Sequence, residues 1–534
     1  MNRKTLVLAA AMGLLAPVLA ACGDSEGGSG DGDGIVVGTT DRFTASEEAP
    51  APLDPAYAYD IGTWNILRQT VQTLMVQPRG DGEPVPDAAE TCGFTDAGNE
   101  RFSCTLRDGL KFANGDAITA ADVKFSIDRA RSIKADSGVF ALLSTIDTVE
   151  TQGDREVIFH LKVADATFPY KLSTPVAGIV NPDDYEDGKL REGFEVDGSG
   201  PYVLESKVEN DELVRATFTK NPSYKGALKV SNTKVEMVSF EDADAMGDAL
   251  EKAEVDVMTR SMSPEQVREL GNATDGEIDL VESPGLEIRY LAFNTEAETV
   301  KDKAVRQAMA QLINRGELVG KVYGSQAEPL YSVVPAGITG HSNAFFNKYG
   351  EANAAEAREL LEKAGVSTPV KLTLHYTTDH YGPATKAEFE QLSKQLNDSG
   401  LFETDIKGAP WSTFRPAGQK GKYDVYGMGW FPDFPDADGF IAPLFDENNY
   451  LNSPYANDKI RDELIPESRR QADRLSASDS LTEIQDIVAI DVPVLPLWQA
   501  KQYIAARDDI TGTAYMLNSS SSLQLWELGR GVSG

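Results

Sequence analysis

Two cysteines, Cys92 and Cys104, have a spacing that suits a disulfide. Their midpoint is Gly98, inside the turn-forming segment 95–100, TDAGNE. Apolar residues such as Phe102 follow this turn and favour strands. A β-hairpin would therefore place the two cysteines opposite each other, at a distance that a disulfide can bridge. The alternative is a pair of buried thiols, and the hairpin geometry favours the disulfide.

Other residues that could perform catalysis or bind metal lack the spacing that this chemistry needs. His375 and His380 are five residues apart, which is not the helical spacing of a zinc pair. An acidic run ending at Gly439 looks like a calcium loop, but its first and twelfth ligand positions would be Phe434 and Phe445. No phosphate-binding loop or Gly-x-Ser-x-Gly elbow occurs in the sequence. We therefore expect no metal, no cofactor and no enzymatic activity.

The N-terminus has the pattern of an export signal. Arg3 and Lys4 precede an apolar run from Leu6 to Ala20, which is too short for a comfortable membrane span. The end of the run, LAAC at 19–22, resembles the signal of a bacterial lipoprotein, which implies cleavage before Cys22 and lipid on its thiol. The alternative is an ordinary secretory signal with an incidental cysteine. The following glycine, serine and aspartate residues favour the lipoprotein, because they would form a flexible tether.

Composition limits the class of protein and the kinds of partner. The chain has 534 residues, of which 41% are hydrophobic, so we expect two or three domains rather than one core. The net charge of −34 makes nucleic acid an improbable partner. No stretch after the signal approaches 18 apolar residues, so the body of the protein is expected to be soluble.

The elements that would position functional residues change in pattern near residue 286. Before it, we expect strands at 35–38, 101–107 and 155–163, and helices at 65–76 and 120–131. Thr119 is a plausible N-cap for the second helix, with Asp122 in its first turn. After residue 286, strands and helices alternate, which indicates an α/β lobe. We expect strands at 288–293 and 370–375, helices at 305–312, 354–364 and 389–396, an apolar extended segment at 493–497, and short polar strands from there to the C-terminus.

A long motif carries a resemblance to a known family. The segment 106–126, LRDGLKFANGDAITAADVKFS, is similar to the signature of the oligopeptide/dipeptide/nickel class of ABC-transporter solute-binding proteins, extracellular solute-binding family 5. The resemblance extends over most of the chain. Further matching motifs are LDP at 53–55, GSGPY at 198–202, NPSY at 221–224, FNT at 293–295, VRQA at 305–308 and GWFPD at 429–433.

This resemblance implies an α/β fold of the periplasmic-binding-protein type, with two lobes around a ligand cleft and an extra domain packed on the first lobe. The first lobe would be discontinuous, because the chain crosses between lobes more than once. The expected boundaries are a signal peptide at 1–21, a flexible tether at 22–34, the first lobe at 35–77, 195–285 and 500–534, the extra domain at 78–194, and the second lobe at 286–499.

The resemblance also implies a binding site. In peptide-binding relatives, an aspartate three residues after a tryptophan holds the N-terminal ammonium of the ligand, and here Asp433 follows Trp430 at this spacing. A buried ammonium needs a carboxylate, although Asp433 could instead be a turn residue between two prolines. Candidates for the cleft wall are Trp430, Trp64, Tyr57 and Tyr59, with Trp411 as a weaker one, and core packing is the alternative for each. Asn294 could bond the ligand or cap a turn.

The function implied is that of a lipid-anchored binding component of an ABC importer, on the outer face of a bacterial cell membrane. It would be a monomer that captures oligopeptides by lobe closure and delivers them to a permease driven by partner ATPases. Alternatives are a binder of a nickel chelate or a sugar on the same fold, a tethered extracellular hydrolase, and a signalling or adhesion lipoprotein.

Overall fold

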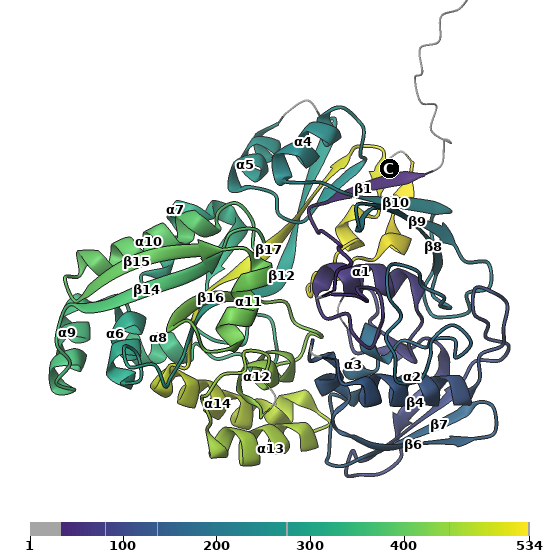
Figure 1. The fold of residues 1–534 in the computed structure, drawn as a ribbon, viewed down its shortest axis with the longest axis horizontal. Coiled ribbons are helices and arrows are strands. Elements are labelled where there is room, and N and C mark those ends of the chain that lie inside the picture. The colour runs from purple at the N-terminus through teal and green to yellow at the C-terminus, as the bar shows by residue number, and fades with distance from the viewer. Residues whose placement is uncertain are drawn as a thin grey trace, which may run out of the picture. The chain divides into compact units, whose positions relative to one another are not determined.

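One sheet of eleven strands joins segments from most of the chain (Figure 1). The structure is a computed structural model that describes residues 34–47, 49–80, 82–135, 137–273, 276–447 and 449–531. The strand order is β15-β14-β16-β12-β17-β11-β1-β10-β9-β8, and β13 also pairs with β17. The bounds are β1 Ile35–Thr39, β8 Tyr202–Glu209, β9 Glu212–Lys220, β10 Lys234–Ser239, β11 Val257–Thr259, β12 Ile278–Phe293, β13 Ala327–Pro329, β14 Val370–Thr377, β15 Phe402–Ala409, β16 Val425–Trp430 and β17 Val494–Arg507.

Strands β12 and β17 connect the two main hydrophobic cores. They pair antiparallel over most of their length, with an irregularity between Pro284 and Ile288. On one side of this irregularity, the core is built from residues between 286 and 498. On the other side, it is built mainly from residues 35–257 and 504–528. Phe434 is the exception, because it belongs to the second core although its neighbours in sequence belong to the first.

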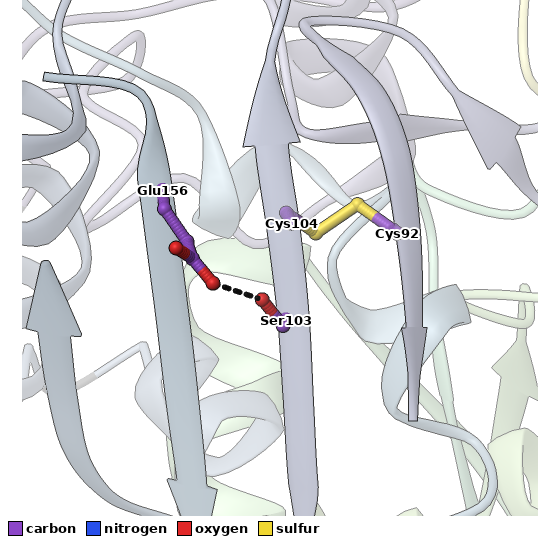
Figure 2. The surroundings of a disulfide bond; sticks show 4 residues. All are labelled: Cys92, Ser103, Cys104 and Glu156. Carbon is purple, nitrogen blue, oxygen red and sulfur yellow. Dashed lines mark hydrogen bonds between the residues drawn. A yellow bond between two sulfur atoms is a disulfide. The ribbon is translucent and has the colours of Figure 1, made fainter. Parts of the chain in front are cut away.

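A separate antiparallel sheet carries the disulfide. Its order is β4-β5-β7-β6, with bounds β4 Ala89–Phe94, β5 Arg101–Leu106, β6 Ile146–Gln152 and β7 Glu156–Leu161. Cys92 and Cys104 are directly opposite each other on β4 and β5 and are joined by an S–S bond of 1.96 Å, as the hairpin predicts (Figure 2). On the other side of β5, the Ser103 hydroxyl donates to Glu156 on β7 at 3.3 Å.

Helices cover the sheets, and several begin where the sequence predicts. At the start of the helix that packs on β6 and β7, the Thr119 backbone N–H donates to the Asp122 carboxylate at 2.7 Å. The α-helices are α1 Ile61–Thr70, α2 Ala120–Ile133, α3 Phe168–Lys171, α4 Ala243–Glu251, α5 Pro264–Asn272, α6 Lys303–Leu312, α7 Arg315–Val322, α8 Ala344–Tyr349, α9 Ala354–Lys363, α10 Thr385–Asp398, α11 Trp411–Gln419, α12 Asp438–Phe445, α13 Ile465–Arg470 and α14 Ser478–Asp491.

One expected helix has other bounds, and one extended segment is confirmed but continues further than expected. The helix expected at 65–76 is α1, which begins earlier because the Asp60 carboxylate accepts the Thr63 N–H at 3.0 Å. It ends before Val71, whose backbone is extended, and a short strand, β2 Met75–Val76, follows and pairs with β3 Val85–Pro86. The extended segment expected at 493–497 is confirmed as the start of β17, but this strand continues, largely buried, to Arg507 where short polar strands were expected. The two-residue strands β18 Ile510–Thr511 and β19 Gly529–Arg530, and short 3₁₀ turns, follow it.

The division into two lobes and an extra domain stays a prediction. The boundary expected at residues 285–286 falls on the irregularity of β12, and the one expected at 499–500 falls inside β17. The signal peptide, Cys22 and the tether as far as residue 33 lie outside the described residues. Within the described ranges, no helix combines the length and the apolar character that a membrane span requires.

Candidate ligand-binding cleft

The carboxylate of Asp433 is buried and has few hydrogen-bond donors. It follows β16 on a short loop, and Phe434, the next residue, packs against Tyr170 of α3 with ring centroids 5.7 Å apart. Asp433 is only 6% exposed. The Tyr59 hydroxyl donates to its Oδ2 at 3.1 Å, and this is its one side-chain hydrogen bond among the described residues.

This environment changes the proton affinity of Asp433. Burial raises the pKa of its carboxyl group to about 7, although the hydrogen bond from Tyr59 and the charges of Arg68 and Lys171 lower it in part. At neutral pH, the carboxylate therefore lacks most of the stabilisation that water would give it. A cation entering from solvent could supply that stabilisation.

Aromatic rings surround this carboxylate. The ring centroid of Tyr59 lies 5.7 Å from that of Trp64, 6.5 Å from that of Trp430 and 6.0 Å from that of Tyr450. Both indoles are held by backbone carbonyls, since Trp64 donates to Ala58 at 2.8 Å and Trp430 donates to Gly439 at 2.7 Å. Fixed rings give a site of defined shape.

Asp433, Tyr59, Trp64 and Trp430 line one cavity of about 100 Å³, which we call the aromatic cavity. The weaker candidate Trp411 also lines it. The sequence-predicted residues of this cavity thus come from the segment before α1, from α1 itself, from the start of α11, and from β16 and the loop after it. The structure places Tyr57 in that first segment, half-buried, but not in the wall of this cavity.

The aromatic cavity adjoins a larger one of about 510 Å³, the large cavity, and shares Tyr59, Asp433 and Tyr450 with it. Charged side chains of both signs line the large cavity. The carboxylates are those of Asp433, Asp438, Asp446 and Glu447, and the cations are those of Lys162, Lys171 and Arg469.

A third cavity of about 140 Å³, the basic cavity, shares Arg260, His380, Tyr381 and Phe431 with the aromatic cavity. Its charged lining consists of Arg260, Arg289, Lys501 and Glu287. The three cavities therefore adjoin one another through shared wall residues, and we call them together the cleft. Charges of both signs line its end near Asp438, and mainly basic side chains line its end near Arg289.

His380 lies where the aromatic and basic cavities meet. Its ring stacks on Trp411, with centroids 3.9 Å apart and planes at 4°. Burial, together with the charges of Arg260, Arg289 and Arg415, lowers the pKa of His380 to about 3. The imidazole is therefore neutral near pH 7 and can both donate and accept hydrogen bonds in the cleft. No group of histidine, cysteine, aspartate and glutamate residues suited to a metal ion occurs in the described part of the chain.

Comparison with known proteins identifies the family. The family described as "Bacterial extracellular solute-binding proteins, family 5 Middle" matches residues 83–452. The chain belongs to this family.

Relatives of this solute-binding protein have similar length and fold. Di/tripeptide-binding protein 3 of Pseudomonas aeruginosa is 26% identical over 508 residues, which cover 88% of this chain and 92% of that protein. The murein tripeptide binding protein MppA of Escherichia coli has a TM-score of 0.80 at 21% identity, over 94% of this chain and 99% of that one. DppA of Helicobacter pylori, in complex with the peptide STSA, has a TM-score of 0.80 at 20% identity, over 93% and 98%. The fold is that of the periplasmic binding proteins.

Asn294 lies away from the other residues that the sequence predicts for the ligand-binding site. On β12, Ile288 is opposite Trp430 and Phe293 is opposite Val425, so Asn294 is at the far end of the strand. At 3.4 Å per residue, it is roughly 20 Å from the Trp430 end. Asn294 lines none of the three cavities. Its side chain instead holds a turn, because it donates to the Gly421 carbonyl and accepts the Glu296 N–H, each at 3.2 Å.

Several cleft residues were missed by the sequence analysis. Arg289 gave a signal, since it is a charged residue inside an otherwise apolar strand segment, 288–293. Tyr450 and Arg415 gave none, because they come from other parts of the chain and meet only in the fold. The Arg415 guanidinium lies 4.6 Å from the Tyr450 ring centroid, and both line the aromatic cavity.

Proposed function

We propose that this protein is the lipid-anchored solute-binding component of an ABC importer and that it captures short peptides by their free N-terminus at Asp433. The observation that carries the proposal is the incompletely hydrogen-bonded carboxylate of Asp433 in the wall of a cleft. A desolvated carboxylate of this kind is costly unless a cation pairs with it. The ammonium group of a peptide supplies such a cation together with three hydrogen-bond donors.

The relatives support a peptide rather than another cationic ligand. Their names describe di/tripeptide, dipeptide, oligopeptide and murein-peptide binding, and one describes glutathione binding. The aromatic cavity would enclose the N-terminal residue, and the large cavity has room for further residues and for water.

Lobe closure would couple binding to delivery. Tyr59 and Asp433 come from segments that the proposed division places in different lobes, so their hydrogen bond would link the two lobes across the cleft. A ligand that contacts both sides favours the closed form by its differential affinity for that form. The closed form would then be recognised by a membrane permease whose partner ATPases supply the energy.

Calorimetry with free and N-acetylated tripeptides tests the ammonium site. Asp433→Asn removes the charge with little change of size, and we expect it to weaken binding of the free peptide by about 2–5 kcal/mol. Acetylation should weaken binding to the wild type by a comparable amount and should matter much less in the variant. Equal losses for free and acetylated peptides, with circular dichroism unchanged, would remove Asp433 from the ammonium site.

The lipid anchor is tested separately. Cys22→Ser should abolish incorporation of labelled fatty acid and move the protein from the membrane fraction to a soluble fraction. Cys22→Ser leaves the cleft residues unchanged, so its peptide affinity should equal that of the wild type. A variant that stays in the membrane fraction, beside a wild type without lipid label, would contradict the anchor.

A further inference from the structure

A fourth cavity, outside the cleft, contains an arginine without a carboxylate partner. We call it the α1 cavity; its volume is about 40 Å³, and it shares no wall residue with the aromatic, large or basic cavity. Arg68 of α1 lines it, and the Arg68 Nε donates to the Ser522 hydroxyl at 3.2 Å. The Nη1 and Nη2 groups of Arg68 make no hydrogen bond and no ion pair with any described residue. Their N–H groups are therefore available to an acceptor from outside the protein.

The positive charge of Arg68 is unfavourable in this position. Burial lowers the pKa of its guanidinium to about 10, and the charge of Asp433 opposes this shift only in part. The guanidinium lies 5.2 Å from the ring centroid of Trp64. The indole face attracts a cation but offers its N–H groups no strong acceptor. A desolvated cation of this kind is best stabilised by an anion that also accepts its hydrogen bonds.

Three amide side chains in the same wall add unpaired hydrogen-bond donors. The Asn518 Oδ1 accepts the Ser522 backbone N–H at 2.9 Å, which leaves its Nδ2 as the free group, and Asn518 is 6% exposed. The Nε2 of Gln77 is buried and has no partner among the described residues. Gln524 is 4% exposed, and its side chain makes no hydrogen bond with the described part of the chain. Unpaired donors beside an unpaired cation favour an anion over a neutral molecule.

Asp87, the one carboxylate among the described residues of this wall, is already hydrogen-bonded. It accepts the Tyr224 hydroxyl at 2.6 Å and the Ala227 N–H at 2.7 Å, and it forms no ion pair with Arg68. Much of the remaining wall is apolar and includes Val71, Val76, Leu228, Leu523 and Trp526. A volume of about 40 Å³ admits roughly three water-sized atoms, so the anion must be small.

We propose that the α1 cavity binds a small monovalent anion, of the size of a halide ion, at Arg68 and the amide groups beside it. The cavity is too small for a peptide or for the carboxylate of a larger molecule, so the ligand is a free ion. This site is distinct from the peptide site of the proposed function, and its occupation does not require a peptide.

The anion would act on the cleft through Arg68. The hydrogen bond from Tyr59 and the charges of Arg68 and Lys171 lower the pKa of Asp433 in part. Lys171 is already paired with Asp165 at 2.6 Å, whereas Arg68 is unpaired. An anion that neutralises Arg68 should therefore raise the pKa of Asp433 further.

Bromide is the probe for the anion site, because its anomalous scattering identifies it in a crystal. Crystals of the protein grown in sodium bromide should contain a bromide ion in contact with the Arg68 guanidinium. In solution, thermal denaturation in sodium bromide is compared with sodium gluconate at equal ionic strength, since gluconate is too large for the cavity. We expect bromide to raise the Tm of the wild type by about 1–3 °C more than that of Arg68→Gln.

A second variant and a control complete the test in solution. Gln524→Glu adds a carboxylate to the same wall with little change of size. It should remove the specific response to bromide, and it tests the proposal if Arg68→Gln does not fold. The matched control is Arg268→Gln on α5, which removes an exposed arginine paired with Glu265 and should retain the wild-type response.

Peptide affinity measured across pH tests the connection to Asp433, and this part rests on the proposed function. Bromide should move the midpoint of the pH dependence to higher pH in the wild type but not in Arg68→Gln. A midpoint that bromide leaves unchanged in the wild type would overturn the connection.

The anion site itself is decided without peptide. A crystal without bromide in the α1 cavity, or an equal response of the wild type and both variants to bromide, would overturn it. A protein that binds no peptide would refute the proposed function and the connection to Asp433, whereas a bromide ion at Arg68 with the expected difference in Tm would still establish the anion site.

Discussion

Two buried aspartates in different regions of the molecule have opposite environments. Asp165, just before α3, is fully buried and accepts bonds from Lys171 at 2.6 Å, from the Thr167 hydroxyl at 2.6 Å and from Thr145 at 2.9 Å. Asp433, after β16, is nearly as buried, but a single tyrosine hydroxyl donates to its side chain among the described residues.

The pKa values of the two carboxyl groups are therefore shifted in opposite directions. Burial raises the pKa of Asp165, but the charges of Lys171 and Arg469 and the hydrogen bonds outweigh it and lower the pKa to about 2. For Asp433, burial dominates and raises the pKa to about 7. A fully bonded buried carboxylate stabilises the fold, whereas an incompletely bonded one destabilises it and is suited to binding. The same residue type thus stabilises the fold in one region and is available for ligand binding in the other.

The largest effect is expected from Asp165→Asn. This change leaves the Lys171 ammonium, whose side chain is 5% exposed, without its carboxylate. We expect a loss of about 3–5 kcal/mol in the free energy of unfolding, measured by urea denaturation at pH 7.

The pH dependence provides the control for Asp165. Because the pKa of Asp165 is lowered in the folded state, its carboxylate stabilises the fold above pH 3.8, the ordinary pKa. This stabilisation is lost as the pH falls through about 2. The wild type and Asp165→Asn should therefore converge in stability only below about pH 2. A constant difference across this range would mean that the substitution perturbs packing rather than charge.

The second prediction is that Asp433→Asn stabilises the ligand-free protein. Because the pKa of Asp433 is raised in the folded state, its ionised carboxylate destabilises the fold. This destabilisation is absent below pH 3.8 and complete above about pH 7. At 1.36 kcal/mol per pKa unit, the gain in the free energy of unfolding at pH 8 is at most about 4 kcal/mol. Urea denaturation at pH 8 and at pH 3.5 measures it, and the gain should vanish at the lower pH.

The same shift predicts how peptide affinity depends on pH. Below about pH 7, the Asp433 carboxyl must lose a proton before it binds an ammonium, so affinity should fall up to roughly tenfold per pH unit. Asp433→Asn should lose this dependence. A destabilised Asp433→Asn with normal peptide binding would show that Asp433 resembles Asp165, and the contrast between the two regions would disappear.

The sequence predicted local structure better than it predicted the cleft. The hairpin around Gly98 and the helix after Thr119 follow from neighbouring residues, and both were placed correctly. Of the cleft residues, Asp433 and Trp430 were named because their motif is contiguous. Arg260, Arg415 and Tyr450 come from distant segments, and no local pattern indicates that they meet.

The sequence also did not reveal how deeply the cleft residues are buried. Sequence alone assigned Asp433 a partner, but its pKa is raised by burial in the fold, which the hydrogen bond from Tyr59 and the charges of Arg68 and Lys171 offset only in part. Asn294 shows the converse: it is in a matching motif, yet the part of β12 between Ile288 and Phe293 separates it from Trp430.

The third prediction concerns the disulfide, which lies in the sheet that contains β4 and β5. Replacing Cys92 and Cys104 together by alanine should lower the free energy of unfolding by about 2–3 kcal/mol, because a short closed loop is released in the unfolded chain. Neither cysteine lines any of the three cavities, so peptide affinity should not change. Thermal denaturation and calorimetry on the double variant check both parts. A loss of peptide affinity would show that this sheet is coupled to the cleft.

The smallest effect is expected from Asn294→Ala. This change removes the two bonds that hold the turn at Gly421 and Glu296, so we expect a loss of about 1 kcal/mol in the free energy of unfolding. Peptide affinity should remain that of the wild type, because Asn294 follows the C-terminal end of β12, away from Ile288, which faces Trp430, and lines none of the three cavities. Tyr59→Phe is the matched comparison: it removes one hydroxyl that bonds Asp433 and should change affinity and its pH dependence. A tenfold weaker binding of peptides by Asn294→Ala would return Asn294 to the site and would mean that the cleft extends along the whole of β12.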